Sequence, residues 1–152
     1  MTEDELIALF KGMPPPPSAV HLGARFLEVN PKAGRIVIEF EARPEFLNPA
    51  GVVQGGFLAA MLDDTMGPAG AIASRGAFFT STIDMNVSFL APAKVGKLIG
   101  RGEALHMGNT ICFLQATLED ADGRIVARAT SSARLIKGVF EKAAQQAGAD
   151  GG

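Results

Sequence analysis

The chain has 152 residues, of which 47% are hydrophobic and 20% are charged, and its formal net charge is −2. This length fits one domain and this composition excludes a mainly disordered chain, while a weakly acidic chain without a basic block is a poor candidate for binding nucleic acid or an anionic membrane. Its single cysteine, Cys112, excludes an internal disulfide framework, and its two histidines leave little for a metal site. We therefore expect no metal or organic cofactor.

The first 17 residues predict a short helix followed by an extended spacer. Thr2 and Glu5 have the spacing of a capping box, and apolar residues follow at helical intervals. The run Pro14–Pro17 cannot continue a helix. The acidic start lacks the basic and apolar regions of a signal peptide, and no run approaches the ~20 apolar residues of a membrane span. We expect a cytoplasmic protein.

Residues 21–30 and 35–42 predict an antiparallel hairpin. The second segment alternates clearly, with Ile36, Ile38 and Phe40 on one face and polar residues mostly on the other. The residues between the two segments, 30–34, have the Asn, Pro and Gly of a turn.

A loop over residues 44–54 leads into a helical pattern from Gly55 to about Arg75. Apolar side chains surround the predicted axis in its first half, which is typical of a buried helix. The pair Gly67-Pro68 is expected to kink or break this helix.

Four strands are predicted after the helix. The alternation is clearest from Phe79 to Leu90, where the odd-numbered residues share one face and the even-numbered residues the other. Residues 97–106, 110–119 and 124–136 indicate three more strands, joined by short turns. Four consecutive strands joined in this way would form an antiparallel meander.

The predicted fold class is α+β, with one central helix wrapped by a curved antiparallel sheet. We divide the chain into an N-terminal helix and proline-rich spacer (1–17), the main domain (18–138) and a C-terminal tail (139–152). From about Gln145 the tail has nothing to bury and is expected to be mobile.

Two neighbouring acids, Asp63 and Asp64, interrupt the apolar helix. They could be surface acids at a partly exposed edge, since charged groups are rarely buried. However, apolar residues precede them and an uncharged stretch follows. A carboxyl group in apolar surroundings favours its neutral form and can serve as a tuned base or acid.

The triplet Gln54-Gly55-Gly56 stands where the loop becomes the helix. The first N–H groups of a helix lack intrahelical partners, and a glycine lets a substrate carbonyl approach them. Such a site can stabilise an oxyanion, and Gln54 adds an amide donor. The alternative is a flexible entry to the helix.

The spacing between the candidate oxyanion site and the candidate base indicates an active site shared by two chains. Gly55 and Asp63 are eight residues apart, which is roughly 12 Å along a helix. A reacting carbon must lie about 3 Å from both a base and the oxyanion donors. Two antiparallel helices in a twofold dimer could place Asp63 of one chain opposite Gly55 of the other.

The stretch Asn48-Pro-Ala-Gly-Val-Val-Gln-Gly-Gly56, with Asp63 nine residues after Gln54, resembles the core motif of hotdog-fold acyl-CoA thioesterases, most closely the phenylacetate-pathway (PaaI-type) group. The similarity extends through Thr82–Asn86 and Ala91–Ala93. It implies a hotdog fold, hydrolysis of an aryl- or short- to medium-chain acyl-CoA to the free acid and CoA, and a homodimer or homotetramer.

The resemblance also implies roles for the matching residues. Asp63 would attack the thioester or activate water, Gly55 would donate its N–H to the thioester oxygen, and Asn48 would help to orient the nucleophilic side. Thr82 would place its hydroxyl near the attacking water, and Ser81 is the less favoured candidate for this role. Gln54 departs from the usual histidine of this group and cannot titrate, which leaves a polarising or structural role. Contacts with the acyl group are expected from these residues: Gly56, Phe57, Ser81 and Phe89, with Met61 nearby.

Other candidates have simpler interpretations. Cys112 lies in an apolar strand with no recognisable histidine partner, so a structural role is favoured. His21 and His106 lack metal-ligand spacing. Arg75, Lys94 and Lys97 could meet the CoA phosphates, although solvated surface charge is the alternative. Two other functions stay open: a hotdog hydratase or dehydratase, disfavoured because no histidine lies between residues 55 and 75, and a non-catalytic acyl-CoA binding module.

Overall fold

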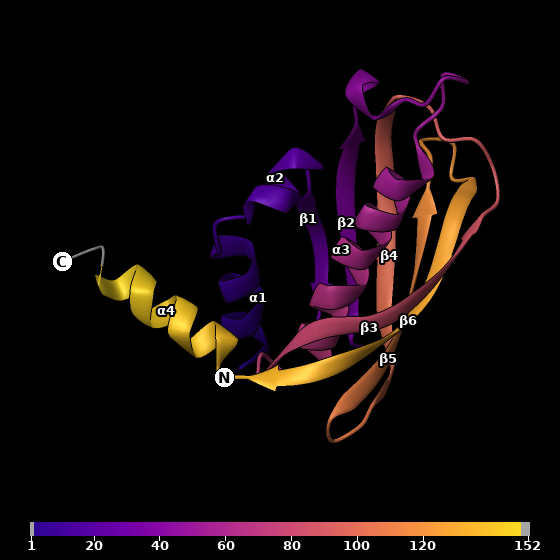
Figure 1. Cartoon of the computed structure of the whole chain (residues 1–152). Helices are drawn as coiled ribbons and strands as arrows, with labels where there is room; N and C mark the ends of the chain where they lie inside the picture. The colour runs from indigo at the N-terminus through magenta and orange to yellow at the C-terminus, as the bar shows by residue number, and fades with distance from the viewer. Residues whose placement is uncertain (1, 150–152) are drawn as a thin grey trace.

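The computed structural model describes residues 2–149 and consists of one curled antiparallel sheet around a central helix (Figure 1). The central helix is α3 (Gly55–Ala73). The sheet order is β1-β2-β4-β5-β6-β3, and neighbouring strands are antiparallel throughout. The six strands are β1 (Arg25–Asn30), β2 (Arg35–Ala42), β3 (Phe78–Phe89), β4 (Gly96–Met107), β5 (Ile111–Glu119) and β6 (Ile125–Lys137). The predicted α+β class, with a sheet curled around one helix, is confirmed.

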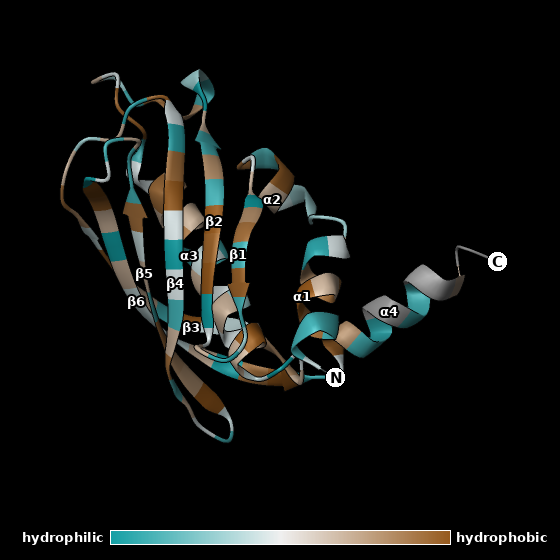
Figure 2. Ribbon diagram, turned by 180° about the vertical axis from the view of Figure 1, so that it is seen from behind, coloured by the Kyte–Doolittle hydropathy of each residue, from teal (hydrophilic) through white to brown (hydrophobic). Residues whose placement is uncertain are grey.

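Burial of α3 depends on close approach of the sheet backbone. Along β2 and β4, hydrophobic and hydrophilic residues alternate in bands (Figure 2), and the apolar set faces the helix. On β4, Gly100 and Gly102 lie so near Thr65 of α3 that a side chain at either glycine would collide with it. The Thr65 hydroxyl donates a hydrogen bond to the Met61 carbonyl oxygen at 2.7 Å, so this buried hydroxyl has a partner inside the core. The helix continues through Gly67-Pro68, so it does not break there.

The four-strand meander is also wrong, because β3 pairs with β6 and not with β4. Only β4, β5 and β6 form a meander, while β4 extends the first hairpin by pairing with β2. The connection from β3 to β4, residues 90–95, contains Pro92 and is no tight hairpin turn. It carries the chain from one edge of the sheet to its middle, and β3 becomes an edge strand.

A β-bulge in β3 corrects the expected alternation. The cross-strand register shifts between Thr82 and Asp84, so Ile83 is an extra residue. Before the bulge Thr82 pairs with buried Ala133, and after it Met85 pairs with buried Ser131. Since directly paired residues share a face, the inward set changes from even to odd numbers at the bulge. Thr82 and Phe89 therefore both face the helix, whereas Ser81 faces away.

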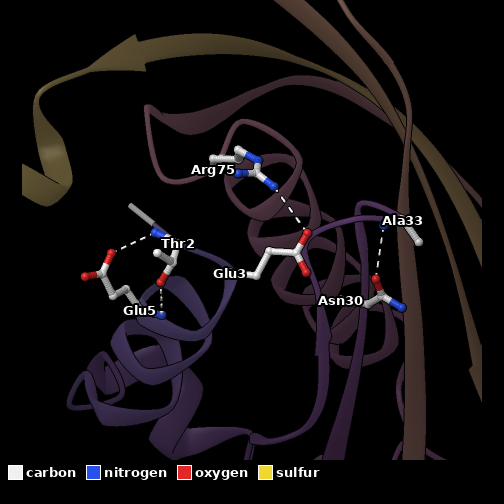
Figure 3. A network of polar contacts seen from close by, with 6 residues as sticks. All are labelled: Thr2, Glu3, Glu5, Asn30, Ala33 and Arg75. Atoms are coloured by element: carbon white, nitrogen blue, oxygen red, sulfur yellow. Dashed lines mark hydrogen bonds and ion pairs between the residues drawn. The ribbon is translucent and has the colours of Figure 1, made fainter.

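The chain ends add structure that the sequence only partly predicted. Helix α1 (Glu3–Gly12) has the predicted capping box between Thr2 and Glu5, shown in Figure 3. A short helix, α2 (Pro17–His21), and a 3-10 turn, η1 (Pro44–Phe46), were not predicted. Helix α4 (Val139–Ala149) occupies most of the predicted tail, and it projects from the body in Figure 1. Residues 150–152 of that tail lie outside the described residues.

Candidate active site

The carboxyl group of Asp63 is held by strand β3. The Thr82 hydroxyl donates a hydrogen bond to Asp63 Oδ1 at 2.7 Å, which links the middle of α3 to the strand beside it. Asp63 is half-buried. The bond exists because Thr82 precedes the bulge and points inward, whereas Ser81 points to the opposite face. One carboxylate oxygen is thus fixed and the other can accept a proton or a bond.

The second acid, Asp64, is also partly buried. Burial raises the pKa of the Asp64 carboxyl above its usual range, and the neighbouring charge of Asp63 raises it further. A hydrogen-bonded carboxylate therefore stands next to one that resists ionisation.

The first turn of α3 is shaped by glycine. Gln54 is the N-cap, and its Oε1 accepts from the backbone N–H of Phe57 at 3.3 Å. A Cβ at Gly56 would lie 2.7 Å from that same oxygen, so glycine makes room for the cap. A Cβ at Gly55 would lie 3.1 Å from the ring of Phe89 on β3. The exposed N–H groups at this positive helix end suit a developing negative charge.

Asn48 organises the loop that enters α3. Its Oδ1 accepts from the backbone N–H groups of Ala50 at 3.0 Å and Val52 at 3.3 Å. Both bonds close the turn before the helix, so within one chain Asn48 fixes the approach to the Gln54-Gly55 corner.

The site residues predicted from sequence fall into two groups within one chain. Asp63 and Thr82 are in contact, and Gln54, Gly55, Gly56 and Phe89 gather at the helix N-terminus. The first group lies at the middle of α3 and the second at its N-terminus, and β3 contributes one residue to each, Thr82 and Phe89. Phe57 stacks on Phe46, with ring centroids 4.2 Å apart.

A cavity of about 680 Å³ borders the acid pair. It is lined by Asp63, Asp64 and Thr82, by residues 10–16 of the predicted N-terminal helix and spacer, and by residues 19–26 that follow them. The available signal was the apolar stripe of the first helix, but nothing in the sequence showed which surface it would cover.

The other candidate residues have structural partners. Cys112 is fully buried, and burial raises the pKa of its thiol, which disfavours the thiolate a nucleophile needs. Arg75 pairs with Glu3 at 3.2 Å and Lys97 with Glu39 at 3.6 Å. Among residues 2–149, no three His, Cys, Asp or Glu side chains group in a way that could hold a metal ion. None of the described helices is long and apolar enough to cross a membrane.

A central helix wrapped by a curled antiparallel sheet is the architecture of the hotdog fold. Residues 50–127 match the family model described as the Thioesterase superfamily. The chain belongs to this superfamily, and the resemblance noted from its motifs is confirmed.

The proteins similar to this chain include two that are more than 30% identical to it. The chain is 31% identical to a protein of Saccharolobus solfataricus named as a putative esterase, over 74% of this chain and 82% of that protein. It is 35% identical to a phenylacetic acid degradation-related protein of Ralstonia eutropha JMP134, whose crystal structure superposes with a TM-score of 0.78 over 85% of this chain and 98% of that one.

A more distant structure shares the fold. A Streptococcus mutans UA159 protein, solved with bound acetyl-CoA, is 21% identical and covers 75% of this chain and 89% of its own, with a TM-score of 0.66.

Proposed function

We propose that this protein hydrolyses acyl-CoA thioesters to a free acid and CoA in a site shared by two subunits. The observation that carries the proposal is the half-buried Asp63 carboxylate, held by Thr82 beside a cavity, on a helix that begins with Gln54-Gly55-Gly56. Membership of the Thioesterase superfamily supports the reaction class. The acetyl-CoA bound to a protein of this fold supports CoA as the thiol part of the substrate.

The chemistry needs a nucleophile and an oxyanion site. The thioester oxygen accepts a hydrogen bond from the backbone N–H of Gly55, where the helix N-terminus favours the charge that develops as the carbonyl is attacked. The free oxygen of Asp63 either attacks the carbonyl carbon or takes a proton from an attacking water. The Thr82 hydroxyl donates to Asp63, so its own oxygen can accept from that water. When water attacks, the carbon–sulfur bond breaks and the proton held by Asp63 passes to the sulfur, so the free acid and the CoA thiol are released. When Asp63 attacks, the carbon–sulfur bond breaks to leave a mixed anhydride and the CoA thiolate; a water then hydrolyses the anhydride, which releases the free acid, restores the Asp63 carboxylate and supplies the proton that the thiolate takes.

Strand β3 suggests how two subunits complete the site. Thr82, which holds Asp63, and Phe89, which touches Gly55, stand on the same strand seven positions apart. Two β3 strands paired antiparallel about an axis near residues 85 and 86 would bring the Thr82 end of one against the Phe89 end of the other. Asp63 of one subunit would then approach Gly55 of its partner.

The edge of β3 has the properties that this pairing requires. An edge strand offers unpaired backbone groups to another strand. Three apolar side chains at or beside this edge are more than half exposed: Ile83 at 57%, Phe89 at 56% and Leu90 at 56%. A second copy would cover them, so we propose a homodimer as the smallest active unit. A homotetramer, the alternative, would be a pair of such dimers.

Release of free thiol from a panel of acyl-CoA substrates tests the function. A thioesterase releases CoA with many turnovers per site. A module that only binds acyl-CoA would bind the same substrates in calorimetry and release none. A hydratase would change the acyl chain of an enoyl-CoA without releasing thiol.

A further inference from the structure

The cavity beside Asp63 has one polar end and long apolar walls. Asp63, Asp64 and Thr82 line it from α3 and β3, where the proposed reaction takes place. The rest of its surface is mainly apolar, with phenylalanines from four separate segments: Phe10, Phe26, Phe79 and Phe140. A ligand with a reactive head and an apolar tail matches this arrangement.

The two ends of the chain supply the walls opposite α3. Phe10 of α1 contacts Phe26 of β1, with centroids 6.3 Å apart, and Phe140 of α4 at 5.8 Å. Phe140 also meets Phe79 at 6.3 Å. Met13 and the prolines that follow α1 line the cavity between these groups. Residues 10–16, which belong to the predicted N-terminal helix and spacer, thus line part of a ligand-sized cavity.

This wall is held in a fixed position. Leu6 and Phe10 of α1 are buried against the body of the domain, and Phe10 has 2% exposure. The Glu3–Arg75 ion pair, at 3.2 Å, links the start of α1 to the residues after α3, as Figure 3 shows. Both partners are exposed, so apolar burial supplies most of the attachment.

The two cations that line the cavity stand at its solvent side. Lys11 and Arg25 are exposed, and Arg25 is paired with Glu39 at 3.0 Å. The apolar interior therefore offers no partner for a charged acyl end.

We propose that this cavity is the acyl chamber of the enzyme, and that it selects medium- to long-chain apolar acyl groups over acetyl or a single aryl ring. The inference rests on the proposed thioesterase function. At roughly 30 Å³ for each water-sized group, an acyl chain of about 8 to 14 carbons takes up about 240–420 Å³, so it fits within the cavity of about 680 Å³. Each methylene buried adds to binding, so the specificity should rise with chain length until the chamber is full.

Hydrolysis of straight-chain acyl-CoA substrates from two to sixteen carbons, with phenylacetyl-CoA beside them, tests this selection. We expect kcat/KM to rise about two- to fourfold per added methylene and to reach a maximum near decanoyl- or dodecanoyl-CoA. Turnover of acetyl-CoA and decanoyl-CoA with equal kcat/KM would contradict the proposed acyl chamber but would still agree with the thioesterase function.

Two variants test whether the acyl chain binds in this cavity. Met13→Trp adds volume to the wall, so kcat/KM for decanoyl-CoA should fall at least about tenfold, as steric exclusion of several methylenes predicts, while that for acetyl-CoA stays within about twofold. Phe140→Ala removes apolar wall and should lower kcat/KM for decanoyl-CoA about fivefold with little change for acetyl-CoA. The matched control is Val20→Trp, an exposed residue of α2 at 61% exposure, which should leave the chain-length profile unchanged.

A binding measurement separates this inference from the proposed function. Calorimetric titration with decanoate, the product acid, should give saturable binding to the wild-type protein and at least about tenfold weaker binding to Met13→Trp. If no acyl-CoA is hydrolysed but decanoate binds to the wild type and binds more weakly to Met13→Trp, the cavity is an acyl-binding site and the proposed reaction is wrong. If Met13→Trp and Phe140→Ala both follow the wild-type profile, the acyl chain binds elsewhere.

Discussion

On one side of α3 the backbone of β4 lies against the helix, whereas on the other side the same helix borders a cavity of about 680 Å³. The first side is built from Thr65, Gly100 and Gly102, with no room for an added Cβ. The second side carries Asp63 and Asp64. The difference shows how one helix can belong to both the core and the site. The close contact with β4 fixes the orientation of α3 about its own axis, and this orientation directs the two acids toward the cavity.

The strongest disruption of the cavity side is expected from separating the subunits. Ile83→Arg places a charge on the proposed β3–β3 contact, so the protein should sediment as a monomer. Its kcat should fall by at least about 10²-fold, because each Asp63 loses the oxyanion donors of its partner. Val20→Arg, on exposed α2, is the matched control and should stay oligomeric. A stable and fully active monomer would contradict the shared site.

The close-packed side is tested by adding one methyl group. Gly100→Ala puts a Cβ against Thr65 and the ring of Phe40, so the free energy of unfolding should fall by about 1–3 kcal/mol. Gly12→Ala is the control, since a Cβ there meets nothing within 4 Å. Urea denaturation measures both. Equal stability of the two variants would mean that β4 does not fix the helix in this way.

The link between α3 and β3 should have a smaller effect on turnover. Thr82→Val keeps the shape of the side chain and removes the bond to Asp63, and we expect kcat to fall about tenfold, the loss of one hydrogen bond to a charged group. Thr82→Ser should restore most of the activity. Ser81→Ala, on the opposite face of the strand, should change kcat little. A larger loss in Ser81→Ala than in Thr82→Val would show that the other face of β3 holds the water.

The smallest expected effect concerns Asp64 and stability. Its pKa is raised in the folded protein, so stability is lost as the pH rises from the unfolded-state pKa, and the loss is complete once the pH exceeds the folded-state pKa. Asp64→Asn removes this penalty, and Tm should rise slightly at pH 8. Below the unfolded-state pKa of about 3.9, both states of the wild type are protonated and the difference should vanish. A lower Tm at pH 8 would show that the Asp64 carboxylate stabilises the fold.

Local sequence patterns predicted the elements but not all of their neighbours. The helix from Gly55 and the strands on either side follow from short-range periodicity, and all are present. The pairing of β3 with β6 depends on how the curled sheet closes around α3, which no short window contains. One extra residue, Ile83, reversed the predicted faces of the second half of β3.

The candidate site likewise has residues that the sequence predicted and residues that it could not predict. Asp63 and the glycines at 55 and 56 were identified from spacing and from the family motif, and Thr82 was favoured over Ser81 on the motif alone. The walls of the cavity could not be predicted, because they bring Phe10 and Phe140 together from opposite ends of the chain.

The central claim is that Asp63 performs the chemistry, and a pair of isosteric variants tests it most directly. Asp63→Asn and Asp64→Asn each remove one negative charge from adjacent positions, so steady-state hydrolysis of decanoyl-CoA by the two folded, oligomeric variants can be compared directly. We predict that Asp63→Asn lowers kcat by at least about 10²-fold with KM largely kept, and that Asp64→Asn changes kcat far less. An inactive Asp64→Asn variant beside an active Asp63→Asn variant would contradict the account.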